Sequence, residues 1–168
     1  QGIRDRAVLL LLARLGLRAA DIVDLQIRDL DWAKGTVRVL GKAKNQVRLP
    51  LPQDAGDALV DYLQRARPRS DHGCVFLCLN APFRPFATSA TVSMIVRLAI
   101  EKAGIPDPPS KGAHLLRHSA ATAMLRSGAS LDAVATILRH ESSDMTAHYA
   151  KVDISLLECV AQPWPEGA

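Results

Sequence analysis

The chain has 168 residues, enough for one sizeable hydrophobic core and too few for two full domains. Hydrophobic residues make up 48% of the sequence and charged residues 23%, a balance typical of a soluble globular protein that argues against disorder. The apolar run at residues 7–13 is far too short to span a bilayer, and it does not have the pattern of a secretory leader. We therefore expect a cytoplasmic protein.

The charge is distributed unevenly along the chain. Residues 1–129 contain 19 Lys and Arg against 11 Asp and Glu, a net charge of +8, whereas residues 130–168 contain 2 against 6, a net charge of −4. The sum is the +4 of the whole chain, and the sequence pI is near 9.2. A basic body of this kind favours a polyanionic partner such as nucleic acid.

Hydrophobic periodicity predicts mainly helices with one hairpin. Helices are predicted for residues 3–15, 19–25, 54–66, 89–103, 112–127 and 130–138, for a short segment that carries His148 and Tyr149, and for residues 154–160. Residues 36–40 and 46–51 alternate as two strands of a hairpin, and residues 75–79 are predicted to add a third strand. The fold class is therefore α+β, mainly helical, with a small antiparallel three-stranded sheet.

Polar side chains concentrate in the last quarter of the predicted core. The segment HLLRH places His114 and Arg117 three residues apart on one helix face, with His118 one turn after His114. The segment LRH ends at His140, and Tyr149 follows nine residues later. Imidazoles, a guanidinium and a phenol on otherwise apolar helices indicate a functional site.

Two upstream features carry further positive charge. Arg18 lies at the junction of the first two predicted helices, where its side chain can be aimed into a cleft or simply face solvent. Lys42 and Lys44 lie at the tip of the predicted hairpin. Lysine at a hairpin tip protects a sheet edge, but it can also probe a groove lined by phosphates.

Conventional catalytic motifs do not fit this set. His114 and His118 could chelate a metal ion, but there is no HExxH and no third ligand at a supporting spacing. The sequence has no GxSxG elbow and no GxxxxGK[ST] or GxGxxG loop, and its three cysteines are spaced unlike a zinc site or a disulfide framework. Fixed cations, imidazoles and a phenol suit metal-free phosphoryl transfer on a diester, because guanidinium groups neutralise charge that develops on the oxygens.

The sequence resembles the catalytic domain of the tyrosine recombinases, the phage-integrase family of DNA recombinases. The resemblance covers residues 1–152 and rests on five segments in the correct order. They are LGLRAADIVDL around Arg18, GKAKNQVRLPL around Lys42, HLLRH at residues 114–118, LRH ending at His140, and Tyr149.

The resemblance implies a reaction without metal, ATP or other cofactor. Tyr149 would attack the scissile phosphate and form a 3′-phosphotyrosyl link while a 5′-hydroxyl leaves. Arg18 and Arg117 would bind the non-bridging oxygens. His140 would donate a hydrogen bond to the same phosphate, and His114 would handle protons near the nucleophile.

The remaining site residues have supporting roles in this interpretation. Lys42 would protonate the leaving 5′-oxygen, and Lys44 is its competitor for that role and otherwise a DNA contact. Asp21, three residues after the first arginine, would orient the cluster, and His118 would hydrogen-bond beside it. Arg139 stands where the family usually has glycine, so it could add a phosphate contact or crowd the turn.

The resemblance also implies partners. We expect double-stranded DNA as the substrate, a homo-tetramer on that DNA, and a monomer or weak oligomer without it. Residues 153–168 would form a C-terminal helix and tail that packs on another subunit. The N-terminal core-binding domain of the family is absent, so we expect the chain to be a fragment.

Two rival functions stay open from the sequence. A type IB topoisomerase shares the arginine, histidine and tyrosine chemistry but relaxes supercoils instead of joining partners. A non-catalytic DNA-binding module could retain the fold, although the intact set of site residues disfavours it. A covalent adduct on a nicked duplex separates an active enzyme from such a module.

Overall fold

The computed structural model describes residues 2–40 and 46–139, and it falls into two compact units, residues 1–120 and residues 121–168. Each unit is described separately. Lys42, Lys44, His140, Tyr149 and the predicted C-terminal helix lie outside the described residues. No helix in the described part of the chain is long and apolar enough to cross a bilayer.

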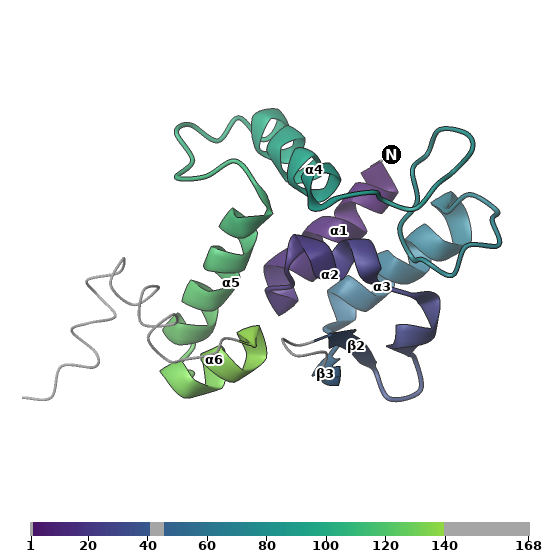
Figure 1. Cartoon of the computed structure of the whole chain (residues 1–168). Helices are drawn as coiled ribbons and strands as arrows, with labels where there is room; N and C mark the ends of the chain where they lie inside the picture. The colour runs from purple at the N-terminus through teal and green to yellow at the C-terminus, as the bar shows by residue number, and fades with distance from the viewer. Residues whose placement is uncertain (1, 41–45, 140–168) are drawn as a thin grey trace, which may run out of the picture. The chain divides into compact units, whose positions relative to one another are not determined.

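The helices of the first unit follow the predicted periodicity closely. They are α1 (Gly2–Leu15), α2 (Ala19–Asp24), α3 (Gln53–Asp61) with its π-helical continuation η3 (Tyr62–Ala66), and α4 (Ser89–Lys102). Helix α5 (Ala113–Arg126) begins in this unit and runs into the second. Figure 1 shows α1, α2 and α3 packed together, and the fold class predicted from the sequence is confirmed.

The small sheet has a different third strand from the one predicted. It consists of β1 (Leu30–Asp31), β2 (Thr36–Leu40) and β3 (Gln46–Pro50), all antiparallel in the order β1-β2-β3. The prediction that residues 75–79 form the third strand was wrong. The main chain there bonds other partners instead: the Val75 N–H donates to the Leu25 carbonyl, and the Leu77 N–H donates to the Tyr62 hydroxyl at 3.2 Å.

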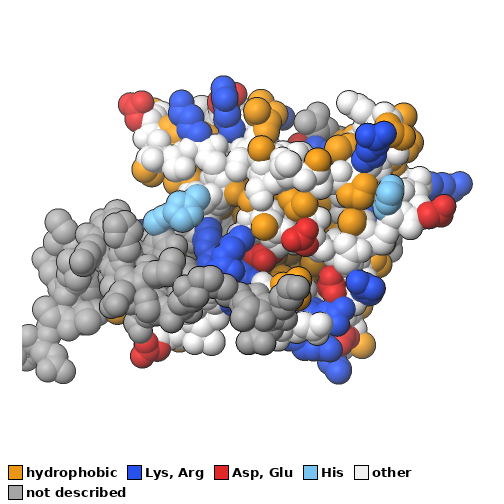
Figure 2. All heavy atoms as spheres, in the orientation of Figure 1, with side chains coloured by type: hydrophobic (Ala, Val, Ile, Leu, Met, Phe, Trp, Pro, Cys, Tyr) orange, Lys and Arg blue, Asp and Glu red, His pale blue; other side chains and the backbone are white. Residues whose placement is uncertain are grey.

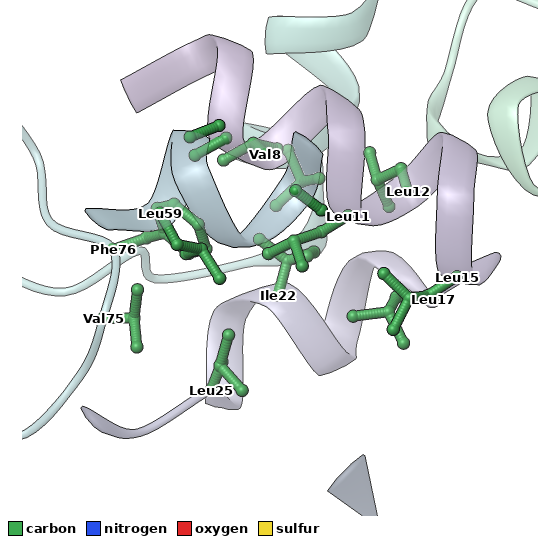
Figure 3. Packing of buried hydrophobic residues seen from close by; sticks show 14 of the residues in the cluster. Val8, Leu11, Leu12, Leu15, Leu17, Ile22, Leu25, Leu59, Val75 and Phe76 are labelled. Carbon is green, nitrogen blue, oxygen red and sulfur yellow. The ribbon is translucent and has the colours of Figure 1, made fainter. Parts of the chain in front are cut away.

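The core of the first unit explains why these elements pack together. Helix α1 presents one apolar face to α2, α3 and residues 75–76 (Figure 3). Burial of this face removes apolar surface from water at roughly 25 cal/mol per Å². The residues labelled in Figure 3 are Val8, Leu11, Leu12, Leu15, Leu17, Ile22, Leu25, Leu59, Val75 and Phe76.

Two arginines hold the irregular segment at residues 72–86 against this core. Arg67 donates from Nε to the Val75 carbonyl at 3.1 Å and from Nη2 to the His72 and Cys74 carbonyls at 2.7 and 2.8 Å. Arg4, buried in α1, donates to the Leu77 carbonyl at 3.2 Å. These guanidinium groups replace the ladder partners that a strand would have supplied.

The second unit has its own small core. The C-terminal half of α5 packs on α6 (Leu131–Leu138) through Ala121, Leu125, Val134 and Leu138. The Ser130 hydroxyl caps α6 by accepting the Ala133 N–H at 3.2 Å. Helix α6 ends at Leu138, two residues before His140 in the sequence.

Candidate active site

The turn between α1 and α2 positions Arg18. Helix α1 ends at Leu15, and the next residue, Gly16, has a φ of 61° in the left-handed region that glycine adopts without steric cost. Two residues later Arg18 is the N-cap of α2, and its backbone N–H donates to Oδ2 of Asp21 at 2.7 Å. The Asp21 carboxylate therefore fixes the backbone on which the Arg18 side chain is mounted.

Helix α5 brings Arg117 to the same turn. The Arg117 side chain is only 5% exposed, and its Nη1 donates to the Gly16 carbonyl oxygen across 101 positions of sequence. A buried guanidinium is costly unless it is hydrogen-bonded, and this carbonyl satisfies one of its donors. The bond joins Arg117 to the main chain two residues before Arg18, the arginine that the sequence predicted as its partner.

The position at the end of α1 also favours a cation. The last carbonyl groups of a helix carry partial negative charge and lack partners within the helix. The Arg117 guanidinium meets this end of α1 at Gly16. The helix predicted for residues 3–15 gave no indication that the Gly16 carbonyl anchors Arg117. A glycine at a left-handed helix end two residues before the arginine was the available signal.

His114 and His118 contact each other directly on α5. Their Nε2 atoms are 2.6 Å apart, and their rings meet edge to face with centroids at 4.2 Å. His114 is exposed and His118 is half-buried. The predicted helical spacing is therefore confirmed, and the two imidazoles form a pair next to Arg117 in sequence. Within the described residues, no cluster of three or more His, Cys, Asp or Glu could hold a metal ion.

Arg139 belongs to the second unit and has an unusual backbone. It caps α6 in the left-handed conformation, with φ 57° and ψ 46°, and its side chain is 8% exposed. This conformation costs an L-residue roughly 1–2 kcal/mol and a glycine very little. The glycine usual in the family at this position thus has a conformational explanation, while the predicted phosphate contact of Arg139 stays a prediction.

Four predicted site residues are not placed by the structure. Lys42, Lys44, His140 and Tyr149 lie outside the described residues. Their roles stay predictions. The structure brings together Arg18, Asp21, His114, Arg117 and His118 within the first unit.

Several basic side chains in the described part of the first unit form ion pairs with carboxylates. Figure 2 shows basic, acidic and apolar side chains interspersed over the visible part of one face. The ion pairs are Arg4–Asp5, Arg14–Asp54, Lys34–Asp31, Arg38–Asp29, Arg48–Asp31, Arg65–Asp61 and Arg97–Glu101. The net charge of the basic body therefore says less about a binding surface than the placement of Arg18 and Arg117 does.

The family of the chain follows from sequence comparison. The model of the phage integrase family matches residues 1–155, so the chain belongs to this family. A protein named as an integrase/recombinase, y4rA of Sinorhizobium fredii, is 48% identical over 165 residues, covering 98% of this chain and 40% of that protein. Tyrosine recombinase XerC of Lactobacillus delbrueckii is 36% identical over 162 residues, covering 92% of this chain and 52% of XerC. The chain thus spans about half the length of these relatives or less.

Solved structures agree on the fold. The crystal structure of XerA recombinase superposes with a TM-score of 0.81 at 26% identity, covering 94% of this chain and 57% of XerA. XerH recombinase bound to its palindromic difH substrate, in a post-cleavage complex, gives a TM-score of 0.77 at 25% identity. That comparison covers 98% of this chain and 46% of XerH. The mainly helical domain with a small three-stranded sheet is therefore the fold of a recombinase catalytic domain.

Proposed function

We propose that this chain is the catalytic domain of a site-specific DNA recombinase or integrase that cleaves and rejoins DNA strands through Tyr149. The observation that carries the proposal is the bond from Arg117 to the Gly16 carbonyl, which ties α5 to the turn that bears Arg18. In the proposed complex, the Arg18 and Arg117 guanidinium groups bind the two non-bridging oxygens of a phosphodiester. Membership of the phage integrase family supports the same reaction class.

The reaction is a pair of transesterifications. In the first, the phenolic oxygen of Tyr149 attacks phosphorus, the bond from phosphorus to the 5′-oxygen breaks, and a 3′-phosphotyrosyl link forms. The Tyr149 proton passes to a base, for which His114 is the candidate, and Lys42 donates a proton to the 5′-oxygen. In the second, a 5′-hydroxyl attacks the link and releases Tyr149. Each step exchanges one phosphodiester for another, so no ATP is consumed.

The other site residues support the charged phosphorane-like transition state. Arg18 and Arg117 neutralise its equatorial oxygens, and preorganised donors of this kind are effective because they need no rearrangement during the reaction. His140 adds a hydrogen bond to the same phosphate. Asp21 acts through the Arg18 backbone, to whose N–H it is bonded at 2.7 Å. Lys44 and Arg139 contact the DNA backbone.

The proposed partner is double-stranded DNA in the cytoplasm. XerH has been solved on its difH substrate, and the fold similarity to XerH supports a DNA duplex as the ligand here. The active assembly is a homo-tetramer on that DNA, with residues 153–168 packing on a neighbouring subunit. Because the chain spans 40% of y4rA and 52% of XerC, complete recombination also requires the rest of a longer protein.

A nicked suicide duplex tests the proposal. The duplex lets the cleaved 5′ strand diffuse away, so an active enzyme accumulates as a covalent protein–DNA adduct that denaturing gel electrophoresis resolves. We expect an adduct with the parent chain and none with Tyr149→Phe. The absence of an adduct on duplexes of varied sequence, or an adduct that persists in Tyr149→Phe, would contradict the proposal. Relaxation of supercoiled plasmid without strand exchange would indicate a topoisomerase.

A further inference from the structure

The paired histidines of α5 have a geometry that the proposed reaction does not use. We infer that His118 is a positioning residue that shares one proton with His114 and so fixes which nitrogen of His114 meets the reacting groups. The inference rests on the proposed function for the meaning of His114. It rests on the structure for the contact itself, because the two Nε2 atoms are 2.6 Å apart.

The 2.6 Å separation between the Nε2 atoms of His114 and His118 leaves room for only one proton between them. A neutral imidazole has one N–H donor and one nitrogen lone pair, and both nitrogens become donors when the ring is charged. Two Nε2–H groups cannot face each other at 2.6 Å, and two lone pairs would repel. One histidine therefore donates from Nε2 and the other accepts at Nε2. Two fully charged imidazoles are incompatible with the contact.

This contact determines the chemistry left to His114. The nitrogen of a histidine that carries the proton is set by the hydrogen bond at the other nitrogen. With Nε2 of His114 engaged by His118, Nδ1 is the nitrogen left for the reacting groups. If His114 accepts from His118, its Nδ1 carries the proton and can donate to a phosphate oxygen. If His114 donates, its Nδ1 has a lone pair and can accept a proton.

The helix that bears the pair is held in place by its neighbours. Leu115 and Leu116 of α5 pack against the core of the first unit, and Arg117 is bonded to the Gly16 carbonyl. The intervening residues thus fix the rotation of α5 between the two histidines. His114 and His118 are one helical turn apart, so their rings are directed to the same face. His118 can therefore restrain the His114 ring without touching substrate itself.

A matched set of variants separates positioning from bulk structure. His118→Phe keeps an aromatic ring but removes both nitrogens. His118→Gln keeps a donor and an acceptor at about the reach of Nε2. His72→Phe is the control, because His72 is an exposed histidine in the loop after η3. Circular dichroism and urea unfolding establish that each variant is folded before it is tested.

Nuclear magnetic resonance reads the pair without any reaction. Long-range proton–nitrogen correlation spectra of the ¹⁵N-labelled chain assign the tautomer of each histidine ring. In the parent chain we expect opposite roles at the two Nε2 atoms. His118→Phe should change the nitrogen shifts of His114, while His118→Gln and His72→Phe should leave its tautomer as in the parent. Unchanged His114 nitrogen shifts in His118→Phe would overturn the inference.

Cleavage of the suicide duplex supplies the functional reading. We expect His118→Phe to form the Tyr149 adduct about 10-fold more slowly or worse, a loss below the roughly 10²–10⁴-fold that general acid–base groups contribute. His118→Gln should return to within about 3-fold of the parent, because it restores the hydrogen bond that orients the catalytic ring. Equal rates for His118→Phe and the parent, or equally slow rates for Phe and Gln, would also overturn the inference. If the parent forms no adduct, the proposed function fails, and the spectra still decide the pairing.

Discussion

The loop after η3 and the turn between α1 and α2 are each held by an arginine that donates to main-chain carbonyl groups. The two contacts differ in how many residues of the chain they span. Arg67 bonds carbonyls that are five to eight residues away, in the loop that follows η3. Arg117 bonds the Gly16 carbonyl, which is 101 residues away. The first contact shapes one loop, whereas the second aligns a helix with the turn that carries Arg18.

The difference shows how an arginine that is bonded to main-chain carbonyl groups can be interpreted. The three acceptors of Arg67 are the His72, Cys74 and Val75 carbonyls of a single loop, so its guanidinium fixes the course of that loop. The acceptor of Arg117 is the Gly16 carbonyl at the end of α1, two residues before Arg18, in a chain of the phage integrase family. We therefore assign Arg67 to stability and propose that Arg117 acts in the reaction. Substitutions at each position can break this assignment.

The largest expected effect is the loss of cleavage when either site arginine is removed. Arg18→Ala and Arg117→Ala should slow adduct formation on the suicide duplex by about 10²–10³-fold, the typical cost of one charge-stabilising donor. Arg18 is half-buried at a helix N-cap, so its variant should remain folded by circular dichroism. Arg67→Ala, assayed under conditions where it is folded, should cleave at the parent rate. Comparable slowing by all three variants would erase the distinction between the two regions.

Substitution of Arg67 is expected to lower stability and not cleavage. Arg67→Ala removes three hydrogen bonds to the His72, Cys74 and Val75 carbonyls, and we expect unfolding free energy to fall by about 2–3 kcal/mol in urea titrations. Arg69, exposed in the same loop, is the matched control. Arg69→Ala should change stability by less than about 0.5 kcal/mol. An Arg67→Ala protein as stable as Arg69→Ala would show that the loop does not depend on this guanidinium.

Tyr62 also holds the main chain at Leu77 in place, through its hydroxyl. This residue is fully buried, and its hydroxyl accepts the Leu77 N–H. Tyr62→Phe leaves that N–H without its acceptor and should cost about 1–2 kcal/mol at pH 8.

Because of Tyr62, we also expect the free energy of unfolding to depend on pH. Burial raises the pKa of the Tyr62 phenol above its ordinary value of 10. The folded state therefore keeps this proton at pH values where the unfolded state loses it, so stability falls as pH rises above about 10. Urea unfolding at pH 8 and pH 10.5 should show a smaller advantage of the parent over Tyr62→Phe at the higher pH. A constant or growing advantage would contradict the burial of a protonated phenol.

The smallest expected change in stability concerns the residues that follow α1 and α6. Both helices are followed by a left-handed residue, Gly16 and Arg139. Arg139→Gly and Arg139→Ala lose the same side chain, but only glycine relieves the positive φ. We expect Arg139→Gly to be about 1 kcal/mol more stable than Arg139→Ala by thermal or urea unfolding. Equal stability would mean that the turn adopts another conformation in the variants.

Much of the fold follows from the sequence, because long periodic segments specify helices. Helices α1, α4 and α5 begin and end within a residue or two of their predicted limits. Residues 75–79 were wrongly predicted as a strand, because an apolar run bounded by turns looks the same whether its partners are a strand or side chains. Only the structure reveals that Arg4, Arg67 and Tyr62 supply part of that bonding.

The site was predictable to a different degree. Arg18, His114 and Arg117 were identified from ordered segments that resemble the family, and the structure brings the two arginines to one turn. The sequence indicates a helix end at Gly16, but it does not show that the Gly16 carbonyl accepts from Arg117, because that contact spans 101 positions of sequence. The contact between His114 and His118 could be anticipated from their spacing, but the choice of Nε2 on both rings depends on side-chain rotation within the fold.

The long reach of the Arg117 contact also bears on the order in which the protein folds. Closing a loop of 101 residues costs roughly 4 kcal/mol of chain entropy, from 1.5 RT times the logarithm of its length. The contacts of Arg67 close within eight residues and need far less. The loop bonded by Arg67 can therefore form early in folding. The contact between Arg117 and Gly16 forms only after distant parts of the chain have met. In partial opening of the fold, the contact between Arg117 and Gly16 is expected to separate before the core does.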